Sequence, residues 1–387
     1  MGVLVGAVVA GAIMVAMQLP LLHEASTSTI EVSQLAVPPT TSIAWPTSAS
    51  AALLIPALGI QRATNDVVLP IASLTKLMTA YVVLEKLPLS IGASGPCVTV
   101  TSADVQYYDS LKASGQSSAA VASGEVLCEN TLLNGLLVHS ASNYATFLAN
   151  LTYGGETAFV AQMNLDAVTL GLSHTHYADV SGYDPGSIST ALEQGRLAAI
   201  LMQSDLVRAI VDQSSVTLPV EGTVGSFTPY VGVDNVVGVK SGRTQAAGGC
   251  DVMAMTFELN GQTQLAYAVV LGARGGDLLG PAGDEALALE QSVLNSEHSL
   301  VLNAGTVVGT LGWGSHRAHV VVTKALSLQW FTALHSANIT ISIATERRAV
   351  HVGERVGWLS VNEGTTHRVA LTVDHAVVPA TILQRLR

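Results

Sequence analysis

The pattern of apolar residues changes near residue 295, and this change limits the fold more than any other feature of the sequence. Alanine and other small apolar residues dominate residues 51–294, where helical and strand patterns are mixed. From about Asn295, short runs rich in β-branched residues alternate with turns that contain Gly, Asn or His. Evenly spaced short strands are typical of a small all-β domain. The sequence therefore predicts a mixed α/β or α+β domain followed by a β domain at 295–387.

The mixed domain is expected to carry strands at both ends with helices between them, which favours a sandwich over a repeated βαβ array. Asn260–Gly261 is a strong turn dipeptide, and it predicts a hairpin of residues 250–259 and 263–273. One further strand is expected at 51–60, and another begins at residues 238–240. The expected helices span residues 73–87, 129–151, 157–170 and 189–203.

The first fifty residues predict two further segments. Residues 1–22 are almost wholly apolar and are long enough to cross a bilayer as a helix. They also fit the apolar region of a secretory signal. The absence of an A-x-A-like cleavage site after Leu22 favours an uncleaved anchor, although no basic residues precede the segment, and a buried soluble helix is a third interpretation. Residues 23–50 are rich in Ser, Thr and Pro and predict an extended, flexible spacer. Either membrane interpretation places the rest of the chain outside the cytoplasm, facing the cell wall.

Charge and cysteine content exclude other classes of protein. The formal net charge is −11, with 17 Lys and Arg against 28 Asp and Glu. A nucleic-acid binder needs a basic face, so no nucleic-acid partner is expected. Cys97, Cys128 and Cys250 form no CxxC pair and give no zinc or redox signal. In an exported protein Cys97 and Cys128 would form a disulfide; three small buried residues is the alternative. No metal or other cofactor is expected.

The stretch from Pro70 to Thr79 carries the first chemical motif, S-x-x-K at Ser73 and Lys76. Residues three apart share a helix face, so the hydroxyl and the amine are expected side by side. A serine hydroxyl is a poor nucleophile until a neighbour takes its proton. Lys76 can take that proton only if burial or nearby positive charge lowers its pKa. Alone, the motif equally fits a solvated lysine beside a helix-capping serine.

Two further motifs follow it along the chain. Lys240-Ser241-Gly242 lies on or enters a strand, and Gly242 allows a substrate to approach the backbone closely. Ser140-Ala-Ser142-Asn143 brings hydroxyls and an amide into the apolar helix expected at 129–151. Buried polar groups need partners, and packing beside Ser73 would supply them. The simpler interpretations are a surface lysine before a turn and a hydroxyl bonded back to its own helix.

The order S-x-x-K, then a serine-containing helix motif, then K-[ST]-G on a strand is the pattern of serine penicillin-interacting enzymes. IASLTKLMTAYVVLE resembles the active-site helix of D-alanyl-D-alanine carboxypeptidases, the low-molecular-mass penicillin-binding proteins. LLVHSASNYATFLA and VGVKSGRTQAAGGCDVMA resemble their second and third motifs, and GLSHTHYADVSGYDPGSISTA resembles the segment between these. The similarity spans about residues 51–274, and the region after 295 resembles the β domain appended to this family.

The resemblance implies a penicillin-binding, β-lactamase-like transpeptidase fold for a catalytic domain at 51–294. It also implies a serine D-Ala-D-Ala carboxypeptidase that acts on peptidoglycan stem peptides and is acylated by β-lactam antibiotics. Ser73 would be the nucleophile, Lys76 the general base and Ser140 the proton relay to the leaving amine. The implied substrate-binding residues are Ser142, Lys240, Ser241, Gly242, Arg243 and Thr244. The oxyanion hole would use the backbone N–H groups of Ser73 and Arg243.

One position departs from the family pattern. The third residue of the second motif is usually Asn, but here it is Ser142, and Asn143 comes one residue late. On a helix one residue is a turn of about 100°, so Asn143 is expected to point elsewhere. Ser142 offers one hydroxyl in place of an amide, which predicts a looser hold on Lys76 and the substrate. The alternative is a helix irregularity that brings Asn143 inward.

Two other functions compete with the carboxypeptidase. A class A β-lactamase would need a glutamate in an E-x-x-L-N-type context between the second and third motifs. Glu156, Glu193 and Glu221 lie in that interval without such a context. A non-catalytic wall-binding protein on the same fold has Ser142 as its only support from the sequence.

Overall fold

The computed structural model describes residues 27–30, 35, 39–313, 316–343 and 349–378. The chain divides into two compact units, one of residues 42–295 and one of residues 296–387 together with residues 1–41. Among the described residues, no helix is long and apolar enough to span a membrane. The apolar segment expected as an anchor or signal, residues 1–22, lies outside the described part of the chain.

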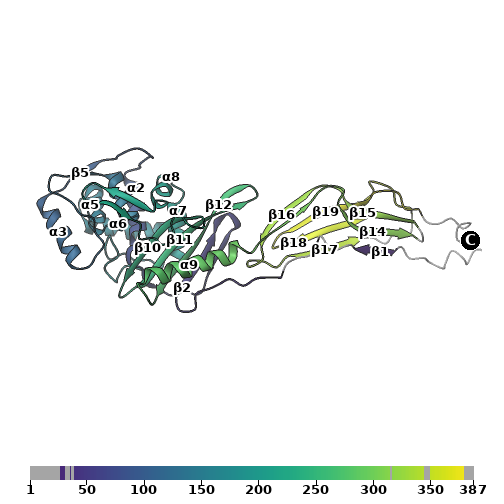
Figure 1. The fold of residues 1–387 in the computed structure, drawn as a ribbon, viewed down its shortest axis with the longest axis horizontal. Coiled ribbons are helices and arrows are strands. Elements are labelled where there is room, and N and C mark those ends of the chain that lie inside the picture. Colours follow the sequence, from purple (N-terminus) through teal and green to yellow (C-terminus); the bar gives the residue numbers. More distant parts are fainter. Residues whose placement is uncertain (1–26, 31–34, 36–38, 314–315, 344–348, 379–387) are drawn as a thin grey trace, which may run out of the picture. The chain divides into compact units, whose positions relative to one another are not determined.

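A five-stranded antiparallel sheet forms the centre of the 42–295 unit (Figure 1). Its strand order is β10 (Val236–Thr244), β11 (Gly248–Leu259), β12 (Gln262–Ala273), β2 (Ser50–Ile55) and β3 (Ile60–Ala63). β11 and β12 form the predicted hairpin around Asn260–Gly261, and this prediction is confirmed. The helices are α2 (Thr75–Lys86), α3 (Ser102–Ala113), α4 (Glu129–Leu137), α5 (Ser142–Tyr153), α6 (Glu156–Thr169), α7 (Ala191–Leu201), α8 (Asp205–Val211) and α9 (Leu279–Leu294).

Both faces of this sheet are buried. Alternate residues of a strand point to opposite faces, and in β11 Val252 and Ala254 join one core while Met253 and Met255 join another. The Met253 face packs against α9, and the Val252 face packs against the helical layer that includes α7. The result is a helix–sheet–helix sandwich, as expected from strands at both ends of this unit.

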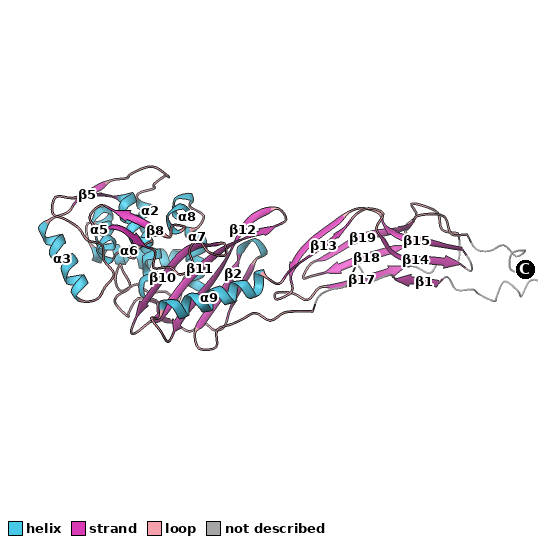
Figure 2. Cartoon of the chain, in the orientation of Figure 1, coloured by secondary structure: helices cyan, strands magenta, loops and turns pink. Residues whose placement is uncertain are grey.

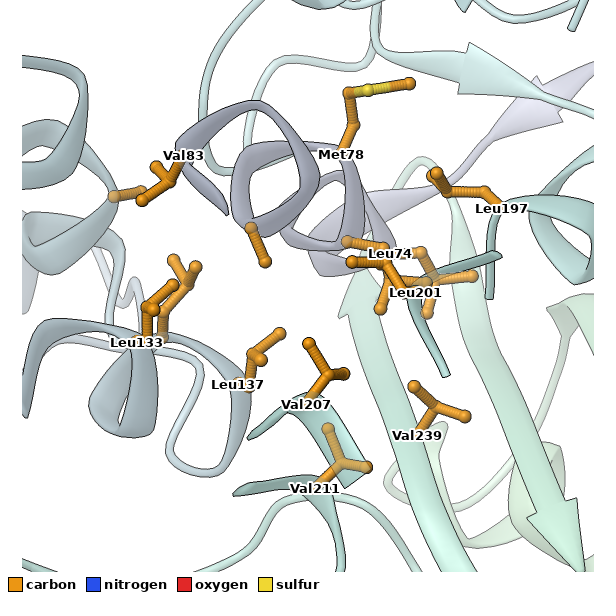
Figure 3. Packing of buried hydrophobic residues seen from close by; sticks show 14 of the residues in the cluster. Leu74, Met78, Val83, Leu133, Leu137, Leu197, Leu201, Val207, Val211 and Val239 are labelled. Carbon is orange, nitrogen blue, oxygen red and sulfur yellow. The ribbon is translucent and has the colours of Figure 1, made fainter. Parts of the chain in front are cut away.

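α2 lies at the centre of the helical layer. Its residues Met78 and Val83 have no exposed surface, and the helix packs against α4, α5, α6 and α7, of which Figure 3 labels Leu133 and Leu137 in α4 and Leu197 and Leu201 in α7. Apolar packing around most of α2 agrees with the position of its exposed charged residues, Glu85 and Lys86, in the last turn. This packing fixes the helix that begins just after Ser73.

Short two-stranded sheets complete the unit: β4 (Leu69–Pro70) with β7 (Ile188–Ser189), β5 (Cys97–Thr99) with β6 (Val126–Cys128), and β8 (Ser215–Leu218) with β9 (Gly222–Gly225). A disulfide joins Cys97 to Cys128 across the β5–β6 pair. Cys250 is free and buried. The disulfide expected for an exported chain is therefore present.

The described residues of the second unit from 296 onward are strands and loops (Figure 2). Its six-stranded sheet has the order β1 (Thr27–Ile30), β14 (Val307–Trp313), β15 (His316–Val322), β19 (Thr366–Val373), β18 (Gly357–Asn362) and β17 (Asn338–Ile343). β13 (Glu297–Leu302) pairs with β16 (Leu326–Phe331). The prediction of an all-β domain after residue 295 is confirmed.

The structure departs from the sequence-based prediction in three places. The strand expected at 51–60 is wrong as a single element, because β2 ends at Ile55, a 3-10 turn (Pro56–Leu58) follows, and β3 begins at Ile60. Residues 27–30 form the edge strand β1 against β14, and Leu35 is buried in the β core, so this part of the predicted spacer is ordered. The β-branched residues of Thr-Ser-Thr-Ile fit such an edge strand. The helix expected at 129–151 is wrong as a single element, because α4 ends at Leu137 and α5 begins at Ser142.

Candidate active site

The serine and the lysine of the first motif meet at the start of α2. Ser73 lies in the 3-10 turn η3 (Ala72–Leu74), which leads directly into that helix. Lys76 Nζ donates a hydrogen bond to Ser73 Oγ over 3.0 Å and another to the Ser181 carbonyl oxygen over 2.8 Å. The predicted contact between residues three apart is therefore confirmed.

The environment of Lys76 favours its neutral form. Its side chain has no exposed surface. Burial lowers the pKa of Lys76 to about 7, because desolvation disfavours the ammonium form, while the negative charge of Asp179 acts in the opposite direction. An amine with a pKa near neutrality exists in part as the free base, which is the form that accepts a proton.

β10 places the third motif, Lys240-Ser241-Gly242, next to Ser73. A Cβ atom added at Gly242 would lie 2.6 Å from the backbone nitrogen of Ser73, so only glycine fits this approach. Lys240 is fully buried, and its Nζ donates to the Ser241 carbonyl oxygen over 2.7 Å. Burial and the nearby Lys76 hold the pKa of Lys240 well below its usual range, with Asp251 acting in the opposite direction. Lys76 and Lys240 are thus both buried and close enough for their charges to interact, and neither side chain lines the cleft over Ser73.

Backbone contacts hold the polar side chains at the rim of the site. Ser241 Oγ donates to the Phe227 carbonyl oxygen over 2.7 Å. Arg243 is exposed, and its Nη1 donates to the Asp277 carbonyl oxygen over 2.6 Å. The other N–H donors of its guanidinium remain suited to a carboxylate, which arginine binds in bidentate fashion. Thr244 lines the cleft next to Arg243.

A cleft of about 250 Å³ opens over Ser73. Its walls are formed by Ser73, Gly115, Gln116, Ser117, Ser142, Ser181, Gly182, Tyr183, Arg243, Thr244 and Gln245. A small hollow of about 40 Å³ beside it brings Ser140, Ser241 and Gly242 to the same serine. A larger hollow of about 600 Å³ lies around Met202 and Tyr267, but it contains none of the predicted site residues. We place the candidate site in the 250 Å³ cleft, because Ser73, which contacts Lys76, lines that cleft.

The break between α4 and α5 brings Ser140 to the nucleophile. Ser140 has a left-handed backbone with φ of 58°, and the Ala141 N–H donates to the Gly135 carbonyl oxygen over 2.9 Å. A continuous helix would not have this geometry, which is why the predicted helix is interrupted here. The Ser140 hydroxyl is buried and has no hydrogen-bond partner among the described residues. It is free to exchange a proton with a group bound beside Ser73.

Ser142 and Asn143 face different parts of the molecule. Ser142 lines the cleft. The fully buried Asn143 binds the backbone of Ala119 instead: its Oδ1 accepts from Ala119 N over 3.0 Å, and its Nδ2 donates to Ala119 O over 2.8 Å. The expectation that Asn143 points away from the site is therefore confirmed.

Two contributors were missed in the sequence. The Ser181 carbonyl oxygen accepts from Lys76, and Gly182 packs so tightly that an added Cβ would lie 1.7 Å from the Ala72 carbonyl oxygen. A backbone carbonyl leaves no signature in a side-chain pattern. The Ser-Gly-Tyr-Asp-Pro-Gly run at 181–186 marks a turn, and it lies in the stretch that resembles the family, but neither feature indicates a contact with Lys76.

Electrostatic and metal-binding features elsewhere are structural. Among the described residues, no group of three or more His, Cys, Asp or Glu side chains could hold a metal ion. His174 pairs with the buried Glu193, with 3.1 Å between Nδ1 and Oε1, and neither residue lines the cleft. The side chains that line the cleft offer hydroxyls, the amides of Gln116 and Gln245, and the guanidinium of Arg243.

The solved structures that resemble this fold include penicillin-binding proteins. The chain is similar to penicillin-binding protein 6B from Escherichia coli, with a TM-score of 0.59 and 22% identity over 90% of this chain and 98% of that one. It is also similar to a D-alanyl-D-alanine carboxypeptidase structure from Francisella tularensis, with a TM-score of 0.60 and 17% identity over 89% of this chain and 96% of that one.

Sequence comparison gives the family. The family model for D-alanyl-D-alanine carboxypeptidase matches residues 59–275. This chain belongs to that family. It is 31% identical over 198 residues to a D-alanyl-D-alanine endopeptidase of Escherichia coli, covering 49% of this chain and 60% of that protein. It is 30% identical over 204 residues to a D-alanyl-D-alanine carboxypeptidase of a Streptomyces strain, covering 48% of this chain and 67% of that protein.

Proposed function

We propose that this chain is a serine-type carboxypeptidase that removes the terminal D-alanine from peptidoglycan stem peptides ending in D-Ala-D-Ala. The observation that carries the proposal is the 3.0 Å contact between Ser73 Oγ and the buried amine of Lys76, whose pKa is lowered to about 7. Residues 51–294 are the proposed catalytic domain, and residues 295–387 the appended β domain.

The proposed reaction is acyl transfer through Ser73. Neutral Lys76 takes the hydroxyl proton while Oγ attacks the carbonyl carbon of the penultimate D-alanine. The backbone N–H groups of Ser73 and Arg243 face the oxyanion in this scheme, and loss of one such donor costs about 2.7–4 kcal/mol of barrier. The C–N bond then breaks, and the proton that Lys76 took passes through the Ser140 hydroxyl to the departing amine, which leaves Lys76 and Ser140 as they began. Water hydrolyses the acyl-enzyme and restores the free serine.

Donors beside Ser73 account for recognition of a free carboxylate. Ser241, Arg243 and Thr244 line the cleft and the hollow and supply donors for the terminal carboxylate, with the buried Lys240 behind them as a further positive group, and Ser142 faces the peptide. A β-lactam carries both a carboxylate and a strained amide, so it enters the same scheme as an acylating inhibitor. None of these steps needs a metal or cofactor.

Glutamate positions argue against a β-lactamase. Glu156 accepts from Thr146 Oγ1 over 2.6 Å, Glu193 from Thr175 Oγ1 over 2.5 Å and Glu221 from the Ala120 N–H over 2.5 Å. None of the three lines the cleft over Ser73. A deacylating water there has no glutamate to activate it. The intact Ser73–Lys76 contact likewise argues against a non-catalytic wall-binding protein.

The Cys97–Cys128 disulfide supports a location outside the cytoplasm, because disulfides persist in oxidising compartments. We infer a protein that faces the cell wall, either secreted or held at the membrane by residues 1–22.

D-alanine release tests the proposal. The full chain is incubated with a synthetic peptide ending in D-Ala-D-Ala, and free D-alanine is measured for the wild type and Ser73→Ala. We expect release by the wild type only, together with covalent labelling of Ser73 by a fluorescent penicillin. Cleavage of a cross-linked peptide without D-alanine release would identify an endopeptidase instead, and equal release by both proteins would refute the site.

A further inference from the structure

One acidic side chain organises the loop that meets Lys76. Both oxygens of the Asp179 carboxylate accept hydrogen bonds from the residues that follow it. The donors are Ser181 Oγ at 2.8 Å, Gly182 N at 2.9 Å, Tyr183 N at 2.9 Å and Ser187 Oγ at 2.8 Å. Hydrogen bonds to a carboxylate are stronger than those between neutral groups. The path of the chain through 181–187 therefore depends on this one side chain.

The same loop is pressed against the turn that carries the nucleophile. Gly182 has a φ of +81°, and a Cβ there would lie 1.7 Å from the Ala72 carbonyl oxygen and 2.6 Å from Thr75 Oγ1. The loop has no room to move toward η3. In this position the Ser181 carbonyl oxygen accepts from Lys76 Nζ over 2.8 Å. The direction of the Lys76 amine is thus set jointly by Ser73 and by the loop.

Asp179 also acts on Lys76 through its charge. Its carboxylate raises the pKa of Lys76 and so opposes the larger effect of burial. The other charged groups in this part of the site are Lys240 on β10 and, beside it on β11, Asp251, which raises the pKa of Lys240. The two groups that accept hydrogen bonds from the amine, Ser73 Oγ and the Ser181 carbonyl oxygen, are neutral. Asp179 is therefore the acidic group of this loop whose charge acts on Lys76.

We propose that Asp179 is a positioning residue for acylation, which holds the Ser181 carbonyl oxygen against Lys76 and sets, by its negative charge, the pH range in which Lys76 acts as the base. This inference rests on the proposed function, because it needs Lys76 to accept the proton of Ser73. Asp179 itself does not line the cleft and does not touch the substrate.

The test is the pH profile of acylation by a fluorescent penicillin, measured on the full chain. Asp179→Asn removes the charge, so the midpoint of the rise in rate moves to lower pH by about one unit. It also loosens the loop, so the plateau rate falls by about a hundred-fold. Asp179→Glu keeps the charge but not the geometry, so its plateau falls while its midpoint stays at the wild-type value. A folded Asp179→Asn protein whose midpoint does not move overturns the inference.

A matched control comes from the same loop. Asp184 is exposed and accepts from the Gly186 N–H over 2.8 Å, so Asp184→Asn makes the same chemical change away from Lys76. Its midpoint and plateau should equal those of the wild type. An equal shift in this variant also overturns the inference.

Failure of the proposed function and failure of the variant to fold can be told apart. If the wild type is not labelled at any pH, the proposed function fails, and the inference fails with it. If Asp179→Asn does not fold by circular dichroism, Ser187→Ala removes one donor to Asp179 and leaves the charge in place. Its plateau should fall several-fold with an unmoved midpoint, and an unchanged plateau overturns the inference.

Discussion

Replacement of Gly242 by alanine tests the close approach of β10 to the nucleophile. The added Cβ would lie 2.6 Å from Ser73 N and 3.1 Å from Ser73 Cβ, whereas ordinary contact begins at 3.4 Å. The strand and the turn must therefore separate by about 0.8 Å to relieve the closest contact. A displacement of about 1 Å at reacting groups lowers rates by about a hundred-fold. The methyl group also crowds the Ser73 N–H, a proposed oxyanion donor, and loss of such a donor lowers rates by about 10²–10³.

The assay for Gly242→Ala is the second-order rate constant for labelling by a fluorescent penicillin, with thermal unfolding measured in parallel. We expect a fall of at least about a hundred-fold in a folded protein. Gly225→Ala is the control, because the nearest atom to its added Cβ is the Ser214 carbonyl oxygen at 4.0 Å. Its rate constant should equal that of the wild type. A folded Gly242→Ala protein labelled within about threefold of the wild type would refute the reasoning.

Three more predictions follow from single features of the site and the fold. The wild-type acylation rate rises about tenfold per pH unit below pH 7 and levels off above it, because only neutral Lys76 accepts a proton and its pKa is about 7; a flat profile from about pH 5 to about pH 9 contradicts this. Ser142→Asn gives the cleft an amide and raises the labelling rate several-fold in the same assay, and an equal or lower rate counts against a binding role for position 142. Removal of the disulfide in a Cys97→Ser/Cys128→Ser double variant lowers the free energy of unfolding by about 3–4 kcal/mol, given a sequence separation of 31 residues, and an unchanged denaturant midpoint contradicts the estimate.

Features encoded in local patterns could be predicted from the sequence. The β11–β12 hairpin follows from Asn260–Gly261 between two apolar runs, and the all-β unit follows from β-branched runs after residue 295. The interruption between α4 and α5 could not be predicted, because Leu137 to Ser142 carry neither Gly nor Pro and residue 140 adopts φ of 58°. Ser140 lines the same hollow as Ser73 in this conformation, so tertiary context overrides the helical preference there. β1 was missed because its partner β14 lies about 280 residues away along the chain, beyond the reach of any local pattern.

The candidate site likewise combines contacts that the sequence predicts with contacts that it does not. Ser73 and Lys76 are one helical turn apart, so their contact follows from helix geometry alone. The low pKa of Lys76 does not, because it comes from burial by residues distant in the sequence. The Ser181 carbonyl oxygen lies 105 residues from Lys76 along the chain, and its position depends on the carboxylate of Asp179. Long-range backbone contacts of this kind carry no sequence motif.

The contacts of Asn143 decide between the two interpretations of the altered second motif. Its amide uses both ends on the backbone of Ala119 inside the protein, over 3.0 Å and 2.8 Å. A helix irregularity that turned Asn143 into the cleft would leave the buried N–H and C=O of Ala119 without partners. Each unsatisfied group costs about 1–3 kcal/mol, a large part of the stability of an ordinary domain. Ser142 N also donates to the Ser117 carbonyl oxygen over 2.9 Å, which fixes the start of α5 against the same wall. The register is therefore held from inside the protein, and the second motif presents the hydroxyl of Ser142, in place of an amide, to the cleft over Ser73, with Ser140 in the adjoining hollow.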